Sequence, residues 1–176
     1  MALPATSFPP SFNDDDAKLI NMVTERFNEK RPHIVLAGLS EDYLTTMRSS
    51  GFRAWQIALG GPGKWMVNGT MFRLPFQAES IRMFVMNLYD PSIVENAVFL
   101  ARQLTEVVEV NGFLFYDAKK APMLHIYLPP EIWMRLPFTW HDVTVYQKIK
   151  HWKGSTKHHG HKKRDVYQRR LVGASA

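Results

Sequence analysis

Short apolar segments alternate with amphipathic segments along most of the chain. The apolar runs HIVLAGL, RAWQIAL, IRMFVMNLY and GFLFYDA are nearly continuous, as in strands buried on both faces, and they begin at His33, Arg53, Ile81 and Gly112. The segment HDVTVYQKI, from His141 onward, alternates apolar and polar residues as an edge strand does. Because helical segments separate most of these strands, the pattern predicts a layered α/β sheet with right-handed crossovers.

Two helices are predicted in the first half of the chain. The segment NDDDAKLINMVTERFNEK offers Asn13 or an early Asp as the capping residue and has acidic residues in its first turn. Ser40 caps the next helix, Glu41 and Asp42 lie at its positive end, and Gly51 ends it. One helix is therefore expected before the first strand and one after it.

The second half predicts one long helix and one short helix. Asp90 and Pro91 supply an N-cap and a first helical residue, and Asn111-Gly112 supplies a stop signal. A short helix is predicted within PPEIWMRL, residues 129–136. The long helix carries an apolar stripe that should face the sheet, formed by Ile93, Val94, Ala97, Val98, Ala101, Leu104 and Val108.

Length and composition bound the class of protein. With 176 residues and 45% hydrophobic content, the chain can build the core of one domain. It has no cysteine, which excludes disulfides, thiolate metal ligands and cysteine nucleophiles. No apolar run reaches the length of a membrane span, so we expect a soluble, intracellular protein without a membrane partner.

Positive charge is concentrated near the C-terminus. Residues 148–170 contain six Lys, three Arg and one Asp, a net charge of +8, whereas the whole chain carries +6. Any inference from basicity is therefore local. The shift in composition predicts an extended arm over residues 1–13, whose Phe8 and Phe12 dock on a partner or on the body. It also predicts a domain over residues 14–150 and a basic tail over residues 151–176 that orders only on binding.

Four segments between residues 32 and 150 carry a family resemblance. They are YLTTMRSSGF, FRLPFQAESIRMFVMN, ARQLTEVVEVNGFLFYDA and VTVYQKI, and they follow one another at suitable spacing. In this order they resemble the class I S-adenosylmethionine-dependent methyltransferases. The resemblance implies an α/β fold with a Rossmann-like sheet flanked by helices, and S-adenosylmethionine as the cofactor of an active member.

The residues that hold the cofactor in that family are mostly replaced here. The family's Gly-x-Gly-x-Gly turn, which lets the backbone approach the cofactor, corresponds to Gly38-Leu39-Ser40-Glu41-Asp42. The acidic residue that holds the ribose hydroxyls falls at Leu59, the Asp that faces the adenine falls at Thr70, and the "FD" pair of the fourth strand falls at Ile81-Arg82. The resemblance leaves no catalytic residue, and the remnant cofactor positions are Gly38, Ser40, Glu41, Leu59, Thr70 and Asn87.

Some of these positions keep two interpretations. Glu41 and Asp42 are helix-start carboxylates, or they pair with the amino group or sulfonium of the cofactor. Asn87 is a strand-end residue that satisfies backbone groups, or it occupies the family's catalytic place after the fourth strand. The loop GGPGK lacks the Gly-Lys-Ser/Thr ending of a phosphate-binding loop and is interpreted as a plain loop.

The basic tail is the other informative region. Its Lys and Arg residues alternate with Trp152 and Tyr167, which suits phosphate neutralisation with some stacking, as in RNA-binding extensions. The alternatives are a solubilising tail and a localisation signal at HKKR. No metal is expected, because the tail histidines lack cysteine or acidic partners at suitable spacing. The candidate RNA-binding residues are Lys150, Lys153, Lys157, Lys162, Lys163, Arg164, Arg169 and Arg170.

Together these features predict a non-catalytic methyltransferase-like protein, a structural or accessory subunit of an RNA-protein assembly such as a ribosome or an RNA-modifying complex. No cofactor is expected in that case. The implied partners are RNA, protein subunits of the assembly, or an active methyltransferase. The alternative is an active S-adenosylmethionine-dependent methyltransferase with an atypical cofactor loop.

Overall fold

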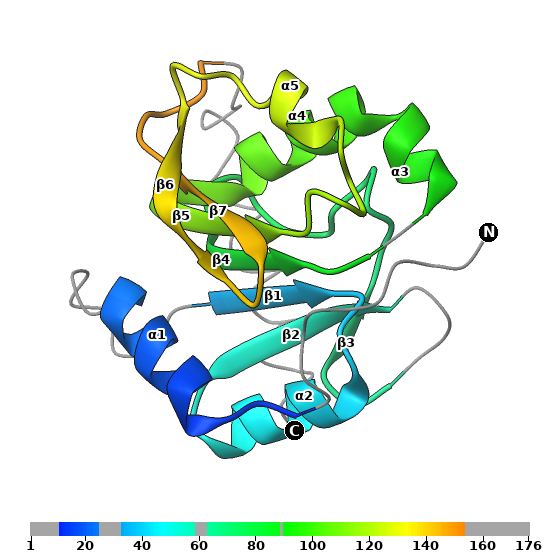
Figure 1. Ribbon diagram of the computed structural model, residues 1–176. Coiled ribbons are helices and arrows are strands. Elements are labelled where there is room, and N and C mark those ends of the chain that lie inside the picture. Colours follow the sequence, from blue (N-terminus) through cyan, green and yellow to red (C-terminus); the bar gives the residue numbers. More distant parts are fainter. Residues whose placement is uncertain (1–10, 25–32, 59–62, 89, 154–176) are drawn as a thin grey trace.

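The computed structural model describes residues 11–24, 33–58, 63–88 and 90–153, which form a mixed sheet with helices on both faces (Figure 1). The strands are β1 (His33–Ala37), β2 (Arg53–Ala58), β3 (Met66–Asn68), β4 (Ile81–Met86), β5 (Val108–Tyr116), β6 (Trp133–Trp140) and β7 (Val143–Lys148). The helices are α1 (Asp14–Thr24), α2 (Glu41–Ser49), α3 (Pro91–Glu95), α4 (Ala97–Val107) and α5 (Leu124–Tyr127).

The strand order of the sheet is β3-β2-β1-β4-β5-β7-β6. The five strands from β3 to β5 in this order pair in parallel, and β7 runs antiparallel to both β5 and β6. This confirms the predicted α/β sheet. The order of connection reverses between β1 and β4, and open α/β sheets of this kind bind ligands beyond the carboxyl ends of the strands at such a point.

Each face of the sheet is covered by its own helices. Figure 1 shows α1 and α2 on one side and α3, α4 and α5 on the other. Side chains of β1 alternate between the two layers: Ile34 and Leu36 pack with Met47 of α2, whereas Val35 packs with Leu104 of α4. This two-sided burial explains the nearly continuous hydrophobicity of the central strands.

The predicted helix starts are confirmed. The Asn13 side-chain oxygen accepts a hydrogen bond from the backbone N–H of Asp16 at 2.9 Å, and the Ser40 hydroxyl accepts one from the backbone N–H of Tyr43 at 3.1 Å. Gly51 follows α2 with φ +94°, a left-handed conformation that glycine adopts without strain. Local capping chemistry therefore fixes where these helices begin and end.

The predicted long helix is two helices. Asp90 caps α3 as predicted, but α3 ends before Asn96 and α4 begins after it. The prediction that Val98 faces the sheet is wrong, because this residue is 49% exposed, and Val94 is only half-buried. Helical phase restarts at the break, so the buried residues are Ile93 of α3 and Ala97, Leu100, Ala101, Leu104, Thr105 and Val107 of α4.

The pair Asn111-Gly112 does not stop a helix as predicted. The strand β5 follows α4 directly, and the pair lies inside this strand. Asn111 has φ 68°, and the pairing of β4 with β5 shifts register between Ile81 and Met83. A Cβ on Gly112 would lie 2.9 Å from the carbonyl oxygen of Arg82. The pair therefore forms an irregularity in β5, and within it the position of Gly112 leaves no room for a Cβ.

The last strands also differ from the prediction. The short helix within PPEIWMRL is wrong, because Trp133 begins β6. The edge strand is β6, and β7, predicted at an edge, lies between β5 and β6. The three-residue strand β3 was not predicted, since so short a segment carries no resolvable period.

The N-terminal arm is described only from Ser11. Phe12 is buried, and its ring packs edge-on against Tyr43 and Phe52 with centroids 5.5 Å apart in each pair. Phe8 and the tail from residue 154 onward lie outside the described residues, so the division into arm, domain and tail stays a prediction. No helix in the described part of the chain is long and apolar enough to cross a membrane.

Candidate functional site

The turn after β1 brings two remnant positions together at the carboxyl edge of the sheet, where β1, β4 and β5 end. Gly38 has φ +76°, and a Cβ there would lie 2.6 Å from the Asn87 carbonyl oxygen. The Asn87 backbone N–H donates to the Ala37 carbonyl at 2.9 Å, which holds the ends of β1 and β4 side by side. The first glycine of the family turn is therefore structurally required in this chain.

After Gly38, buried side chains of the protein occupy the space within and beneath the turn. Leu39 is 7% exposed and packs in the core between the sheet and α2. The Gln56 side-chain amide of β2 donates to the Leu39 carbonyl oxygen at 2.9 Å, and both residues are buried. A side chain of the neighbouring strand thus occupies space directly under the backbone of this turn.

The next turn residues serve the start of α2. Ser40 caps the helix, while Glu41 and Asp42 are exposed in its first turn. Carboxylates are favourable at this position because the N-terminus of a helix carries partial positive charge. The helix-start interpretation therefore accounts for all three residues without a ligand.

Asn87 lies in a buried polar cluster that joins the ends of β4 and β5. The Lys120 ammonium donates to the Asn87 side-chain oxygen at 2.7 Å. Asp117, the first residue after β5, accepts a hydrogen bond from the Lys119 backbone N–H at 2.9 Å. Burial lowers the pKa of Lys120, and the nearby Asp117 carboxylate partly opposes that shift. The side chain of Asn87 is therefore engaged with a cation of the same chain.

Asp117 and Lys120 were not among the predicted site residues. They are 5% and 7% exposed, and they stand in the segment YDAKK, which overlaps the end of a predicted buried strand. Polar side chains at the carboxyl end of a parallel strand are candidates for a site at that edge. This signal was available in the sequence.

The remaining cofactor positions that the structure describes do not join this cluster. Thr70 is exposed in a turn after β3, where its hydroxyl accepts a hydrogen bond from the Arg73 backbone N–H at 3.1 Å. Leu59, the position of the ribose-binding carboxylate, lies outside the described residues, as do most of the GGPGK loop residues. Among the cofactor positions in the described part of the chain, only Gly38 and Asn87 are brought together.

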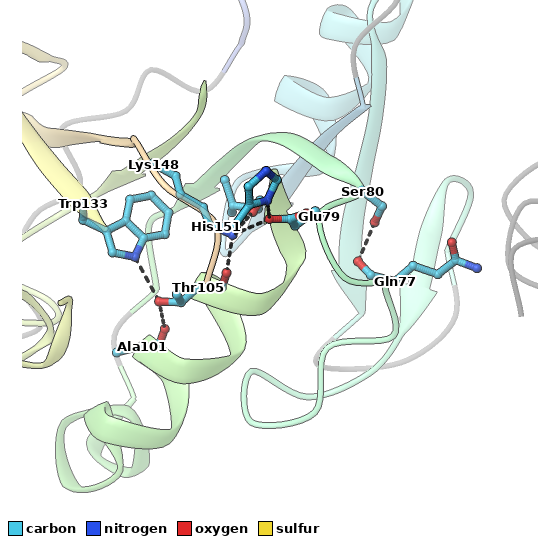
Figure 2. A network of polar contacts seen from close by, with 9 residues as sticks. Gln77, Glu79, Ser80, Ala101, Thr105, Trp133, Lys148 and His151 are labelled. Atoms are coloured by element: carbon cyan, nitrogen blue, oxygen red, sulfur yellow. Dashed lines mark hydrogen bonds and ion pairs between the residues drawn. The ribbon is translucent and has the colours of Figure 1, made fainter. Parts of the chain in front are cut away.

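A second polar network lies at the amino edge of the sheet, where β4 and β5 begin (Figure 2). Lys148, at the end of β7, is fully buried, and its ammonium donates to the carbonyl oxygens of Thr105 at 2.6 Å and Val108 at 2.7 Å. The same ammonium lies 3.5 Å from the Glu79 carboxylate. A buried cation is thereby satisfied by the last carbonyls of α4 and by one carboxylate.

The Glu79 carboxylate also holds the segment that leads into the tail. It contacts Nδ1 of His151 at 2.6 Å, and its own side chain is 7% exposed whereas the His151 side chain is 65% exposed. Glu79 has φ 51°, and its backbone N–H donates to the Glu106 carbonyl of α4 at 2.8 Å. Figure 2 shows Lys148 and His151 meeting at this carboxylate.

Thr105 connects the same network to β6. Its hydroxyl accepts a hydrogen bond from the Trp133 indole N–H at 2.9 Å and donates to the Ala101 carbonyl at 2.7 Å (Figure 2). A buried threonine in the last turns of α4 therefore ties this helix to the edge strand.

Of the candidate RNA-binding residues, the structure describes Lys150 and Lys153, and both are exposed. Trp152 between them is half-buried against the core on the α4 side, and the Arg102 guanidinium lies 5.5 Å from its ring centroid. The remaining candidates, Lys157, Lys162, Lys163, Arg164, Arg169 and Arg170, lie outside the described residues. Among the described residues there is no group of three or more His, Cys, Asp or Glu that could hold a metal ion.

Comparison with known proteins identifies the fold. No protein-family model and no curated protein sequence matches the chain. The solved S-adenosylmethionine-dependent methyltransferase from Methanosarcina mazei is 10% identical with a TM-score of 0.50, and the match covers 72% of this chain and 97% of that one. The S-adenosyl-L-methionine methyl transferase from Silicibacter pomeroyi DSS-3 is 11% identical with a TM-score of 0.45, covering 78% of this chain and 99% of that one.

Larger methyltransferases match over part of their length. Geranyl diphosphate C-methyltransferase from Streptomyces coelicolor A3(2) is 11% identical with a TM-score of 0.40, over 57% of this chain and 45% of that one. The chain spans less than half of that enzyme. The Methanosarcina match and the strand order together show that this chain has the Rossmann-like fold of class I methyltransferases, as the resemblance implied.

Proposed function

We propose that this chain is a non-catalytic methyltransferase-like protein that serves as a structural or accessory subunit of an RNA-protein assembly. The observation that carries the proposal is at the carboxyl edge of the sheet, the place where this class of sheet binds ligands. There the Asn87 side chain accepts its hydrogen bond from Lys120 of the same chain at 2.7 Å. The side-chain oxygen of Asn87, which would meet a ligand at this edge, is therefore engaged within the chain.

The residues of this edge do not fit S-adenosylmethionine. Ser40 and Asp42 replace two glycines of the turn, and the Gln56 amide is bonded to the backbone under Leu39. Leu59 stands where a carboxylate would receive the ribose hydroxyls. Leaving such hydroxyls unmatched costs about 2–3 kcal/mol, which weakens binding roughly 30- to 140-fold before any steric cost of the turn.

The RNA part of the proposal is supported by the position from which the tail departs. Lys148 and His151 fasten the start of the tail at the amino edge through Glu79. This edge is opposite to the one that bears Gly38 and Asn87. A basic segment that begins there suits attachment to a polyanion better than delivery of a substrate to the carboxyl edge.

An active methyltransferase is the second candidate, and one observation favours it. Gly38 keeps its left-handed conformation and its close approach to Asn87, so the first position of the cofactor turn has the geometry that the family requires. The Methanosarcina mazei protein of similar fold is described as a methyltransferase dependent on S-adenosylmethionine.

Calorimetric titration of the full chain with S-adenosylmethionine separates the two candidates. We expect no saturable heat at sub-millimolar cofactor, with a cofactor-binding methyltransferase as the positive control. A saturable isotherm in the micromolar range would overturn the non-catalytic proposal. The RNA part is tested independently, by fluorescence anisotropy of the full chain with labelled RNA at two salt concentrations.

A further inference from the structure

We propose that the RNA-binding surface of this chain begins on its folded body, at a patch we call the basic root. The basic root consists of Arg102 on α4 together with Lys150, His151 and Lys153 beyond β7. It binds RNA through the phosphate backbone. This inference rests on the proposed function and adds a defined site on the domain to the predicted binding by the tail.

The segment that carries the basic root is fixed to the body on two sides. His151 contacts the buried Glu79 carboxylate at 2.6 Å, next to the fully buried Lys148 (Figure 2). The ring of Trp152 packs against the core on the α4 side and lies 5.5 Å from the Arg102 guanidinium carbon. Because these contacts hold the backbone, Lys150 and Lys153 project from a defined position.

The exposed charges of the basic root are positive, as binding to a polyanion requires. Arg102, Lys150 and Lys153 are exposed and the His151 side chain is 65% exposed, whereas the Glu79 carboxylate beneath them is 7% exposed and is paired with Lys148. The lysine and arginine charges of the patch therefore face solvent, while the Glu79 carboxylate faces the interior.

Two acidic side chains limit the strength of the patch. Glu106 is half-buried one turn beyond Arg102 on α4. Glu131 is exposed beside Ile132, whose carbonyl accepts a hydrogen bond from the Ile149 backbone N–H. We therefore expect the basic root to contribute a few phosphate contacts, with the remaining contacts supplied by the tail that continues from it.

The surroundings of Trp152 indicate which part of an RNA the basic root contacts. Trp152 packs against the core, and the Arg102 guanidinium lies over its ring. Trp152 therefore serves as an anchor for the segment that carries Lys150 and Lys153. The exposed groups around it are cations, which contact phosphates and carry no base sequence information. Binding at the basic root should therefore be independent of sequence, and it should weaken with salt by only a shallow slope because the contacts are few.

The test uses the full chain and a fluorescent oligouridine strand at about 50 and about 200 mM salt. The variants are Arg102→Gln and the double variant Lys150→Gln/Lys153→Gln. Lys18→Gln is the matched control, because it removes one exposed positive charge from α1 on the other face of the sheet. We expect each basic-root variant to weaken binding roughly threefold to tenfold at the lower salt and to reduce the salt slope by about 0.7 per lost contact.

The control variant should bind like the parent chain, and Arg102→Lys should restore most of the loss since it keeps the charge. If both basic-root variants bind like Lys18→Gln, the inference is overturned while RNA binding by the full chain, and with it the proposed function, stands. If the parent chain does not bind RNA at all, the proposed function fails and the inference fails with it. Tighter binding to polyglutamate than to RNA, sensitive to the same variants, would assign the patch to an acidic protein and overturn the inference.

Discussion

Tyr43 of α2 donates a hydrogen bond to the Asp16 carboxylate of α1 at 3.1 Å, inside the protein. The Trp140 indole N–H donates to the same carboxylate at 3.0 Å, and His141 contacts it from the turn between β6 and β7. Asp16 is 1% exposed, so these donors replace the water it has lost. One buried carboxylate therefore joins two helices and a hairpin that are distant in sequence.

Replacing Tyr43 with Phe should destabilise the protein through Asp16. The substitution keeps the ring in the core but removes one donor from a buried carboxylate, at a cost of about 1–3 kcal/mol. The measurement is the free energy of unfolding in urea. Tyr127→Phe, at a tyrosine 43% exposed on α5, is the matched control and should change it by less than about 0.5 kcal/mol. Equal values for the two variants would contradict the role assigned to the hydroxyl.

The stability of the protein should fall in alkali because of two buried tyrosines. Burial raises the pKa of Tyr43, and the Asp16 carboxylate adds to the shift; burial followed by the interaction with Tyr146 raises the pKa of Tyr116. Unfolded tyrosine releases its proton near pH 10, whereas the folded protein keeps both protons. Unfolding is therefore favoured as pH rises above about 10, and this effect is absent below about pH 9.

Absorbance of tyrosinate during an alkaline titration checks this expectation. Part of the tyrosinate absorbance should develop only at the pH where circular dichroism shows unfolding. We call this part the late fraction, and Tyr43→Phe and Tyr116→Phe should each reduce it. An unchanged late fraction in both variants would show that the two tyrosines ionise in the folded state.

Two substitutions to aspartate test which face of α4 is buried. Ala101→Asp places a carboxylate at a site 1% exposed, and we expect a loss of about 3–5 kcal/mol, enough to lower the melting temperature by roughly 10 °C or to unfold the domain. Val98→Asp, at a site 49% exposed, should cost less than about 1 kcal/mol. Thermal unfolding followed by circular dichroism compares them, and the reverse order would refute the helix phase.

The strands β1, β2, β4 and β5 and the starts of α1 to α3 were predictable because their signals are local. A buried strand shows as an apolar run, and a cap such as Ser40 is read within one turn of chain. The alternation in β7 suggested an edge strand, but β7 pairs with β5 on one side and with β6 on the other. The order of these two strands was therefore not predictable from alternation. The break at Asn96 was missed because the apolar stripe continues through it in the sequence.

In the candidate site too, local features were predictable and contacts between residues distant in sequence were not. Gly38 and Asn87 were found, since each lies near the end of an apolar run predicted as a strand. The bond from Lys120 to Asn87 spans 33 residues, and the contact of Glu79 with His151 spans 72, so no local pattern reports either pairing. Tertiary contacts also place Trp152 against the core, a position that its neighbours in the sequence do not report, and its predicted stacking on RNA bases stays a prediction.

Restoring one carboxylate should not restore cofactor binding. Leu59→Asp supplies the acidic residue of the family, but the side chains of Ser40 and Asp42 remain in the turn, and Gln56 remains bonded to Leu39. Calorimetry with S-adenosylmethionine should therefore show no saturable binding at sub-millimolar concentration. Micromolar binding by this single variant would mean that the missing carboxylate, and not the turn, had been the obstacle.

The basic tail should supply most of the affinity for RNA. A chain ending at Lys153 keeps His151 on Glu79 and Trp152 on the core, so it should keep its fold, whereas ending at Lys148 would remove both contacts. The residues it loses include Lys162, Lys163 and Arg164. If the tail engages about five phosphates, the affinity of the full chain for duplex RNA falls as roughly the fourth to fifth power of salt concentration.

The truncated chain should retain only the shallow salt dependence of the basic root, with a melting temperature close to that of the parent. Charge reversal at Lys162, Lys163 and Arg164 in the full chain should weaken binding to unrelated RNA sequences alike, because phosphate contacts carry no sequence information. Anisotropy at two salt concentrations compares the three proteins. Equal affinities of the full and truncated chains would show that the tail serves another purpose, such as docking on an acidic protein.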